Sequence, residues 1–227
     1  MARRPHLLID FDHTLFDTDR FFWVDLRGAV LEAGIDPVAW GRAYDDVWPT
    51  GYSLAKHLRR LNQLSVGVEG TRVLRRLVRE RFQDLRAYVF PDVVPTLRAW
   101  RRAGVTLVLL SFGHPTWQDF KVRGAGLPAY FAQILYAQRA GGKGSLCRRL
   151  ARDDPRLAVV DNNPRDLDAM RALVPGLRTF LMQRVPWEAL EASEGPNGWH
   201  FHEARRYVGL PARFPHRLVS RLSEVTP

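Results

Sequence analysis

Short apolar runs alternate along the chain with segments of helical periodicity. Continuous apolar runs at Leu7–Ile9, Val105–Leu110 and Leu157–Val160 each end in a small polar or acidic residue. Runs of this kind are typical of strands buried on both faces of a parallel sheet. Between these runs, apolar residues recur at helical spacing over 93–103, a segment that Gly104 closes, and over 115–125. The alternation predicts an α/β fold, a Rossmann-like doubly wound parallel sheet with right-handed crossovers.

Residues 17–90 have a different pattern, with no sustained period-two alternation. Between Thr18 and Ile35 the apolar residues Phe21, Phe22, Leu26 and Val30 lie close to helical spacing. We predict an all-helical insert of about four helices after the first strand. The predicted division is therefore a core of residues 1–16 and 91–227 and a helical segment of residues 17–90.

Four arginines within this segment, Arg72, Arg75, Arg76 and Arg79, fall on one face of a helix. They would suit a polyanion, but a solvated face is the commoner outcome for such a pattern. Apolar residues at the intervening positions predict the core-facing side of the same helix. We therefore predict a solvated face.

The chain beyond residue 184 is harder to interpret. Residues 193–199 have the composition of a loop, Trp199–His202 is a candidate edge strand, and His216–Val225 is a candidate closing helix. His200 and His202 would face the same way on a strand, but no third metal ligand lies near them in sequence. We predict two surface histidines there.

The composition indicates a folded globular protein. The chain has 227 residues, of which 46% are hydrophobic and 11% aromatic. The single cysteine, Cys147, excludes an intramolecular disulfide and favours a reducing, cytoplasmic setting. The apolar run near the start has no room for a secretory signal, and no segment approaches the length of a membrane span. We expect a soluble protein with no membrane partner.

The formal charge of +10 would suit nucleic acid or anionic substrates. However, 31 of the 34 basic residues are arginines, a skew that resembles a general compositional preference. The charge therefore gives little support for a nucleic-acid partner. The same skew makes the three lysines, Lys56, Lys121 and Lys143, more informative.

Acids gather at the end of the first apolar run. Asp10 follows it directly and Asp12 lies two residues later, at the edge of the sheet where α/β proteins bind ligands. One carboxylate can attack an electrophile while the other transfers a proton. Asp at a strand end is also common simply as a turn residue or helix cap. The later residues of the chain decide between these interpretations.

Polar groups at three further points complete an ordered set. In sequence order, the set is Asp10 with Asp12, Ser111, Lys143, and Asp161 with Asp166. This set, spread over residues 5 to about 182, resembles that of the haloacid dehalogenase-like hydrolase superfamily, whose members are mostly phosphatases. The resemblance implies that residues 17–90 form a helical cap that can close over the site.

The resemblance also implies a role for each acid. Asp10 would be the nucleophile that forms an aspartyl-phosphate, and Asp12 would protonate the leaving oxygen and then activate water. Asp10 and Asp161, with the main-chain carbonyl of Asp12, would bind Mg²⁺, which prefers oxygen ligands. Asp166 would bind the ion through water or orient Lys143.

Ser111 and Lys143 would bind the phosphoryl group. Lys121 is a rival for the charge-balancing role, but it lies in the middle of a predicted helix, where a solvated lysine is the commoner outcome. We therefore prefer Lys143, which opens a helix after Gly141 and Gly142. The glycines around Lys143 do not match an NTP-binding loop, because Gln138 and Gly144 stand where that loop needs Gly and Ser or Thr.

Asp12 favours phosphoryl transfer over dehalogenation, since dehalogenases of this superfamily lack an acid two positions after the nucleophile. Two positions depart from many relatives: residue 13 is His instead of Gly, which would narrow the pocket or add a polar contact, and residue 162 is Asn instead of Asp. Neither departure removes a residue that the mechanism needs.

The sequence therefore predicts a Mg²⁺-dependent phosphatase that acts on a small phosphorylated metabolite. A phosphomutase with the same nucleophile remains an alternative, as does a non-catalytic phosphate- or nucleic-acid-binding module. Trp23, Trp48 and Tyr52 are candidates to line a substrate pocket, although aromatic residues at helical spacing are more often core. Neither the substrate nor the oligomeric state follows from the sequence.

Overall fold

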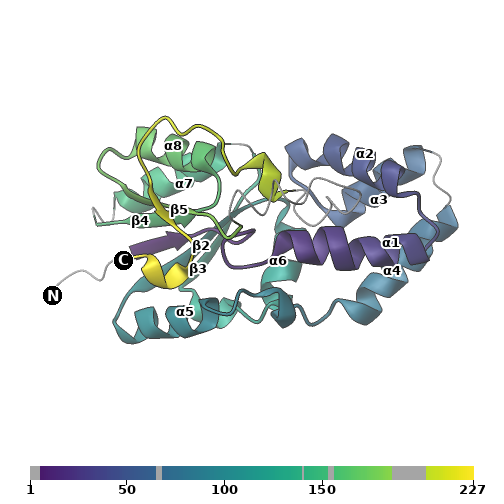
Figure 1. Cartoon of the computed structure of the whole chain (residues 1–227), viewed down its shortest axis with the longest axis horizontal. Coiled ribbons are helices and arrows are strands. Elements are labelled where there is room, and N and C mark those ends of the chain that lie inside the picture. Colours follow the sequence, from purple (N-terminus) through teal and green to yellow (C-terminus); the bar gives the residue numbers. More distant parts are fainter. Residues whose placement is uncertain (1–5, 65–67, 140, 153–155, 186–202) are drawn as a thin grey trace.

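The computed structural model describes residues 6–64, 68–139, 141–152, 156–185 and 203–227. Its core contains a six-stranded sheet in the order β3-β2-β1-β4-β5-β6, in which every neighbouring pair is parallel (Figure 1). The strands are β1 (His6–Ile9), β2 (Thr106–Phe112), β3 (Gln133–Ala137), β4 (Ala158–Asp161), β5 (Arg178–Met182) and β6 (Arg217–Val219). The predicted doubly wound α/β fold is confirmed.

Both faces of the sheet are covered, which explains the continuous apolar runs. Leu7 and Ile9 of β1 belong to one apolar cluster and Leu8 to the other, because alternate side chains of a strand point to opposite faces. The helices of the core are α5 (Val93–Arg102), α6 (Pro115–Gly124), α7 (Gly142–Ala151) and α8 (Pro164–Leu173). In Figure 1, α7 and α8 lie on one side of the sheet and α5 on the other.

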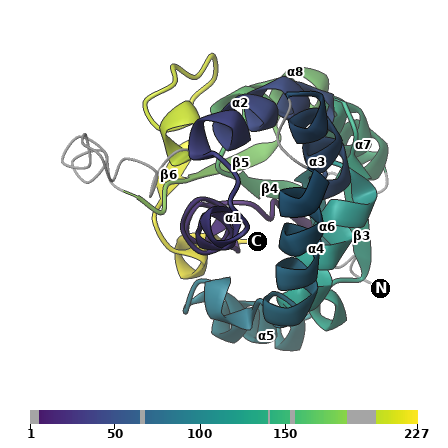
Figure 2. The same ribbon diagram turned by 90° about the vertical axis from the view of Figure 1, so that its right-hand side faces the viewer.

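A group of helices lies beyond one edge of the sheet, as Figures 1 and 2 show. A π-helical segment (Asp19–Leu26) continues into α1 (Arg27–Glu32), followed by α2 (Pro37–Val47), α3 (Leu54–Gln63) and α4 (Val68–Arg81). The two ends of this region pair with each other: the Asp17 N–H donates to the Tyr88 carbonyl at 2.8 Å, and the Phe90 N–H donates to the Leu15 carbonyl at 3.1 Å. The chain thus leaves and re-enters the core at one place, although the boundaries of a separate cap stay a prediction.

The arginine-rich face of α4 points to solvent. Its four arginines are exposed, while Leu74, Leu77 and Val78 are buried. Arg72 pairs with the exposed Glu69 at 3.0 Å. The predicted solvated face is confirmed.

The predicted closing helix at His216–Val225 is wrong. Residues Arg217–Val219 form the edge strand β6, and only a short 3₁₀ turn, Leu222–Glu224, follows. Backbone pairing with the outer edge of β5 outweighs the local helical pattern, and the Asp92 carboxylate accepts the Leu222 N–H at 2.6 Å. The candidate edge strand at Trp199–His202 and the two histidines in it lie outside the described residues. No helix in the described ranges has both the length and the apolar character needed to cross a bilayer.

Candidate active site

Three acids meet around the ammonium of Lys143. β1 and β4 are parallel neighbours, so Asp10, just after β1, and Asp161, at the end of β4, lie at the same edge of the sheet. The Lys143 Nζ atom is 2.7 Å from Asp10 Oδ1, 2.7 Å from Asp161 Oδ2 and 3.4 Å from Asp166 Oδ2. The structure therefore brings these four predicted site residues together.

Turns after the strands hold these side chains in place. Gly141 has a left-handed φ of 73° directly before α7, so Lys143 lies in the first turn of that helix. The Asn163 side chain caps α8 and Pro164 occupies its first position, a combination that favours helix initiation. The Asn163 N–H also donates to Asp161 Oδ1 at 2.9 Å, which fixes the Asp161 carboxylate.

The electrostatics of this cluster favour a protonated lysine. Burial raises the pKa of Asp10 and of Asp161, although the nearby positive charge of Lys143 opposes that rise. Burial alone would lower the pKa of Lys143, but the charges of Asp10 and Asp161 outweigh it and raise that pKa well above its ordinary value. One buried ammonium is thus shared by several carboxyl groups.

Among the buried polar atoms that have no hydrogen-bond partner within the described part of the chain, two belong to predicted site residues. They are Asp10 Oδ2 and Ser111 Oγ. Buried polar atoms are normally paired, so such exceptions at a strand-end site are consistent with a group that binds there. Ser111 itself is fully buried at the end of β2, and its neighbours Phe112 and Gly113, not Ser111, are among the described residues that line the cavity above Asp10.

Asp12 has its own set of partners. Its carboxylate accepts hydrogen bonds from Thr18 Oγ1 at 2.5 Å and Gln118 Nε2 at 2.9 Å, and it pairs with the Lys121 ammonium. Burial would raise the pKa of Asp12, but Lys121 and the two other donors outweigh it, so the pKa is lowered. In this arrangement Asp12 is a carboxylate.

The prediction that Lys121 is solvated is wrong. Lys121 is 3% exposed and Gln118 is equally buried. α6 begins only a few residues after the end of β2, so one of its faces is turned toward the loop that carries Asp12. Residues three apart share a helix face, and this spacing together with the scarcity of lysine was the available signal.

The donor atoms suit a hard divalent ion in part. Asp10 and Asp161 supply carboxylate oxygens, and Asp10 Oδ2 is buried without a hydrogen bond inside the described ranges. Within those same ranges, however, no three His, Cys, Asp or Glu side chains are grouped as a ready metal site, and Lys143 lies between the carboxylates. The carboxylate chemistry thus fits a hard divalent ion in part, and the binding of Mg²⁺ through Asp10, Asp161 and the main-chain carbonyl of Asp12 stays a prediction.

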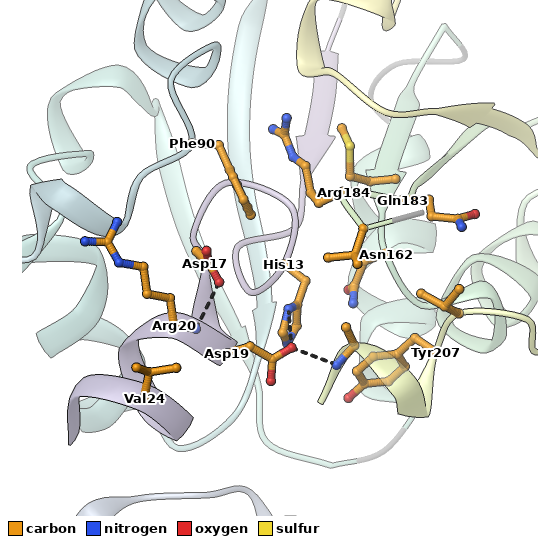
Figure 3. Close-up of a pocket in the computed structure, with 14 residues that line it drawn as sticks. His13, Asp17, Asp19, Arg20, Val24, Phe90, Asn162, Gln183, Arg184 and Tyr207 are labelled. Carbon is orange, nitrogen blue, oxygen red and sulfur yellow. Dashed lines mark hydrogen bonds and ion pairs between the residues drawn. The ribbon is translucent and has the colours of Figure 1, made fainter. Parts of the chain in front are cut away.

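His13 ties the loop after β1 to the C-terminal part of the chain. It has a left-handed φ of 56° and is buried, with Nε2 at 3.2 Å from Glu203 Oε2 and Nδ1 at 3.7 Å from Asp19 Oδ2. Asp19, which lies beside His13 in Figure 3, also accepts the N–H groups of Glu203 and Ala204, at 2.8 and 3.0 Å. The sequence indicated an added polar contact at His13, but Glu203 lies 190 positions away and gave no signal.

These contacts also shift the pKa of the buried groups. Burial would lower the pKa of His13, yet Asp19 and Glu203 outweigh it and raise that pKa to about 9. Burial raises the pKa of Asp19 to about 7 in spite of the positive charge of His13. The protonated imidazole is thus a fixed part of the loop structure near pH 7.

A cavity of about 530 Å³ opens above Asp10 and Asp12. Its walls come from the loop after β1, the helical segment, the end of β2 and the residues that follow Glu203. Of the three aromatic residues that the sequence offered as pocket candidates, Trp48 and Tyr52 line this cavity. Trp23 is 1% exposed in the aromatic core and does not line the cavity. A second cavity of about 440 Å³ borders the other side of His13, which lines both (Figure 3).

Comparison with known proteins agrees with this fold. The family model of the haloacid dehalogenase-like hydrolases matches residues 5–173. The chain therefore belongs to the haloacid dehalogenase-like hydrolase family, and it is a hydrolase with the α/β fold of that family.

Two curated relatives are phosphatases by name. The chain is 31% identical over 104 residues to enolase-phosphatase E1 of Xanthobacter autotrophicus, a match that covers 43% of this chain and 45% of the relative. It is 29% identical over 126 residues to phosphoserine phosphatase of Thermus thermophilus, covering 48% of this chain and 47% of the relative. The chain thus spans about half the length of the curated relatives it matches.

Solved structures share the fold at lower identity. A haloacid dehalogenase-like hydrolase from Burkholderia xenovorans LB400 superposes with a TM-score of 0.71 at 19% identity, over 98% of this chain and 97% of the other. The L-2-haloacid dehalogenase of Xanthobacter autotrophicus gives a TM-score of 0.61 at 16% identity, over 98% and 96% of the two chains. The fold is thus common to relatives with different reactions.

Proposed function

We propose that this hydrolase is a Mg²⁺-dependent phosphatase that cleaves a small phosphomonoester through an aspartyl-phosphate on Asp10. The observation that carries the proposal is Asp12, an acid two residues after Asp10 that is held by three donors at the edge of the same cavity. The names of the two curated relatives support the same reaction class. A halide leaves without a proton, so a dehalogenase has no use for this second acid.

In the first step a carboxylate oxygen of Asp10 attacks phosphorus, and the bond from phosphorus to the ester oxygen breaks. The departing oxygen takes a proton from the Asp12 carboxyl. The lowered pKa of Asp12 in the structure means that its carboxyl must leave Lys121 before it carries that proton. In the second step water attacks the aspartyl-phosphate, Asp12 accepts a proton from the water, and phosphate and free Asp10 are released.

Positive charge at the site offsets the repulsion between the Asp10 carboxylate and the phosphate dianion. Lys143 supplies one ammonium beside Asp10, and it would also contact the transferring phosphoryl group. Bound Mg²⁺ would add charge neutralisation and polarise a phosphoryl oxygen. Asp166, 3.4 Å from Lys143, orients the lysine, and the buried Ser111 hydroxyl is proposed as a donor to the phosphoryl group.

The proposal is tested by measuring phosphate release from a panel of phosphorylated metabolites with Mg²⁺. The Asp10→Asn variant should lose activity by roughly 10⁴-fold or more, because it removes the nucleophile while keeping the shape of the side chain. EDTA should abolish the activity of the unaltered protein, and added Mg²⁺ should restore it. Circular dichroism of Asp10→Asn serves as the control for folding.

Other results would assign another reaction. Release of chloride from L-2-chloropropionate without phosphatase activity would indicate a dehalogenase. A requirement for a bisphosphate activator would indicate a phosphomutase. Salt-sensitive binding of RNA or DNA that persists in Asp10→Asn, without turnover of any ester, would indicate a binding module.

A further inference from the structure

The cavity above Asp10 has charged residues at its floor, and a cluster of aromatic rings forms part of its walls. Its floor holds Asp10, Asp12 and Lys143. Its walls carry the aromatic side chains Phe22, Tyr44, Trp48, Tyr52, Phe112 and Trp117. A phosphoryl group bound beside Asp10 would leave the rest of the ester within the same cavity as these rings.

The deeper rings form a fixed wall. Phe22 lies 5.1 Å from Tyr44 and 5.2 Å from Tyr52, and Tyr52 lies 5.5 Å from Trp117, measured between ring centroids. All four side chains are buried. Rings packed at these distances hold one another in place, so this part of the cavity is preformed.

The outer rings are more accessible. Trp48 and Phe112 are half-buried, and their ring centroids lie 5.9 Å apart at an interplanar angle of 63°. The Arg206 guanidinium lies 5.4 Å from the centroid of the Trp48 ring and pairs with Asp45 of α2. Trp48, which belongs to the helical segment, is thereby in contact with the C-terminal residues that close the cavity.

Polar side chains such as Asn162, Asn163 and Arg165 also line the cavity, but the faces of the aromatic rings offer few hydrogen bonds to a leaving group. The Tyr52 hydroxyl already donates to His57 Nδ1 at 3.0 Å, since His57 Nε2 donates to the Trp40 carbonyl at 2.9 Å. Phenylalanine rings have no polar group to offer. Hydroxyls of a polyhydroxylated leaving group that lay against these ring faces would lack partners there, which is unfavourable. A planar apolar ring would not have this cost.

We propose that the substrate is a phosphomonoester whose leaving group carries an aromatic or conjugated planar ring, which contacts Trp48 and Phe112. The inference rests on the proposed phosphatase function and narrows its substrate class. Ring contacts bind both ground state and transition state, so their effect falls mainly on KM.

The test compares primary alkyl esters, in which the bond that breaks is of the same kind. Purified full-length protein with Mg²⁺ should hydrolyse 2-phenylethyl phosphate with a kcat/KM about tenfold or more above that for glucose 6-phosphate, mostly through a lower KM. Trp48→Ala should reduce this preference at least about fivefold, and Trp48→Phe should keep most of it. Tyr130→Ala, which alters a half-buried ring that does not line the cavity, is the matched control and should leave the preference unchanged.

Equal kcat/KM values for the two esters, or a preference that survives Trp48→Ala, would overturn the inference while leaving the phosphatase proposal intact. Absence of hydrolysis of every ester would instead contradict the phosphatase proposal. In that case, calorimetric titration of the unaltered protein with each ester decides the inference by itself. Tighter binding of 2-phenylethyl phosphate supports the aromatic site, and equal binding refutes it.

Discussion

Each of the two acids in the loop after β1 pairs with a buried lysine, and the two lysines differ in how many carboxyl groups they contact. Lys143 lies among Asp10, Asp161 and Asp166, so one positive charge is shared by three carboxyl groups. Lys121 pairs with a single carboxylate in the part of the chain that the structure describes, and neutral donors from a threonine and a glutamine complete that contact.

The difference explains why two acids two residues apart have opposite pKa shifts. Burial raises the pKa of Asp10 by more than the nearby charge of Lys143 lowers it, and the charge of Asp12 adds to the rise. The pKa of Asp12 is lowered, because Lys121 and the other donors outweigh its burial. The balance between burial and the nearby charges and hydrogen-bond donors therefore differs between the two acids.

Replacement of Lys143 should have the largest effect on stability. Lys143→Met leaves three acids near one another without a cation, which should lower the free energy of unfolding near pH 7 by about 3–5 kcal/mol. The pKa of the buried acids would then lie further above the unfolded value. The loss should therefore shrink as the pH falls toward those values and the acids become neutral. Urea unfolding at several pH values measures both effects.

Lys121→Met is the matched comparison for this experiment. Asp12 keeps two neutral hydrogen bonds and has a side chain that is 22% exposed, so the loss near pH 7 should be smaller, about 1–3 kcal/mol. Equal losses in the two variants would show that sharing of the ammonium does not distinguish the two clusters.

The chemical roles of the two acids can be separated by the leaving group. Asp12→Asn should lower kcat for an alkyl phosphate by about 10²- to 10³-fold, because the alkoxide then departs without a proton. The loss for 4-nitrophenyl phosphate should be smaller, since that phenolate needs no proton to leave. Parallel measurements of kcat for both esters test this. An identical loss for both would argue against proton donation by Asp12.

A buried histidine of the helical segment should affect stability only under acid conditions. Burial lowers the pKa of His57 to about 3, well below the value of about 6.5 in the unfolded chain. Between these two values only the unfolded state binds the proton, so the free energy of unfolding should fall as the pH drops below about 6.5. Near pH 4.5 the contribution is about 2–3 kcal/mol.

His57→Gln checks this assignment, because glutamine can donate to the Trp40 carbonyl and accept from Tyr52 without titrating. Urea unfolding near pH 7 and near pH 4.5 gives the loss for each protein. The variant should lose less stability between the two conditions than the unaltered chain. The same loss in both would assign the acid sensitivity to other groups.

Much of the core could be predicted from local pattern. The runs that end at Asp10, Ser111 and Asp161 predicted buried strands, and parallel strands must bring their carboxyl ends to one edge. The same rule accounts for the position of Lys143 near the acids in the structure, because a helix that opens after a strand begins at the same edge. The wrong prediction at His216–Val225 shows the limit of the method, since a short segment takes its conformation from an available sheet edge.

Lys121 shows a second limit. A lysine in the middle of a helix is usually solvated, and only the packing of α6 against the loop after β1 buries this one beside Asp12. Glu203 and Arg206 close the site from the far end of the chain, more than 150 positions from the residues they contact. Long-range contacts of this kind leave no periodicity in the sequence.

The sequence by itself determined the parallel sheet and the acids at its edge, because strand periodicity and strand ends are local properties of the chain. Only the tertiary structure decided which lysine pairs with which aspartate, and that aromatic rings cover the charged floor. Those features depend on burial and charge among groups far apart in sequence, and such energies exist only after the chain has folded.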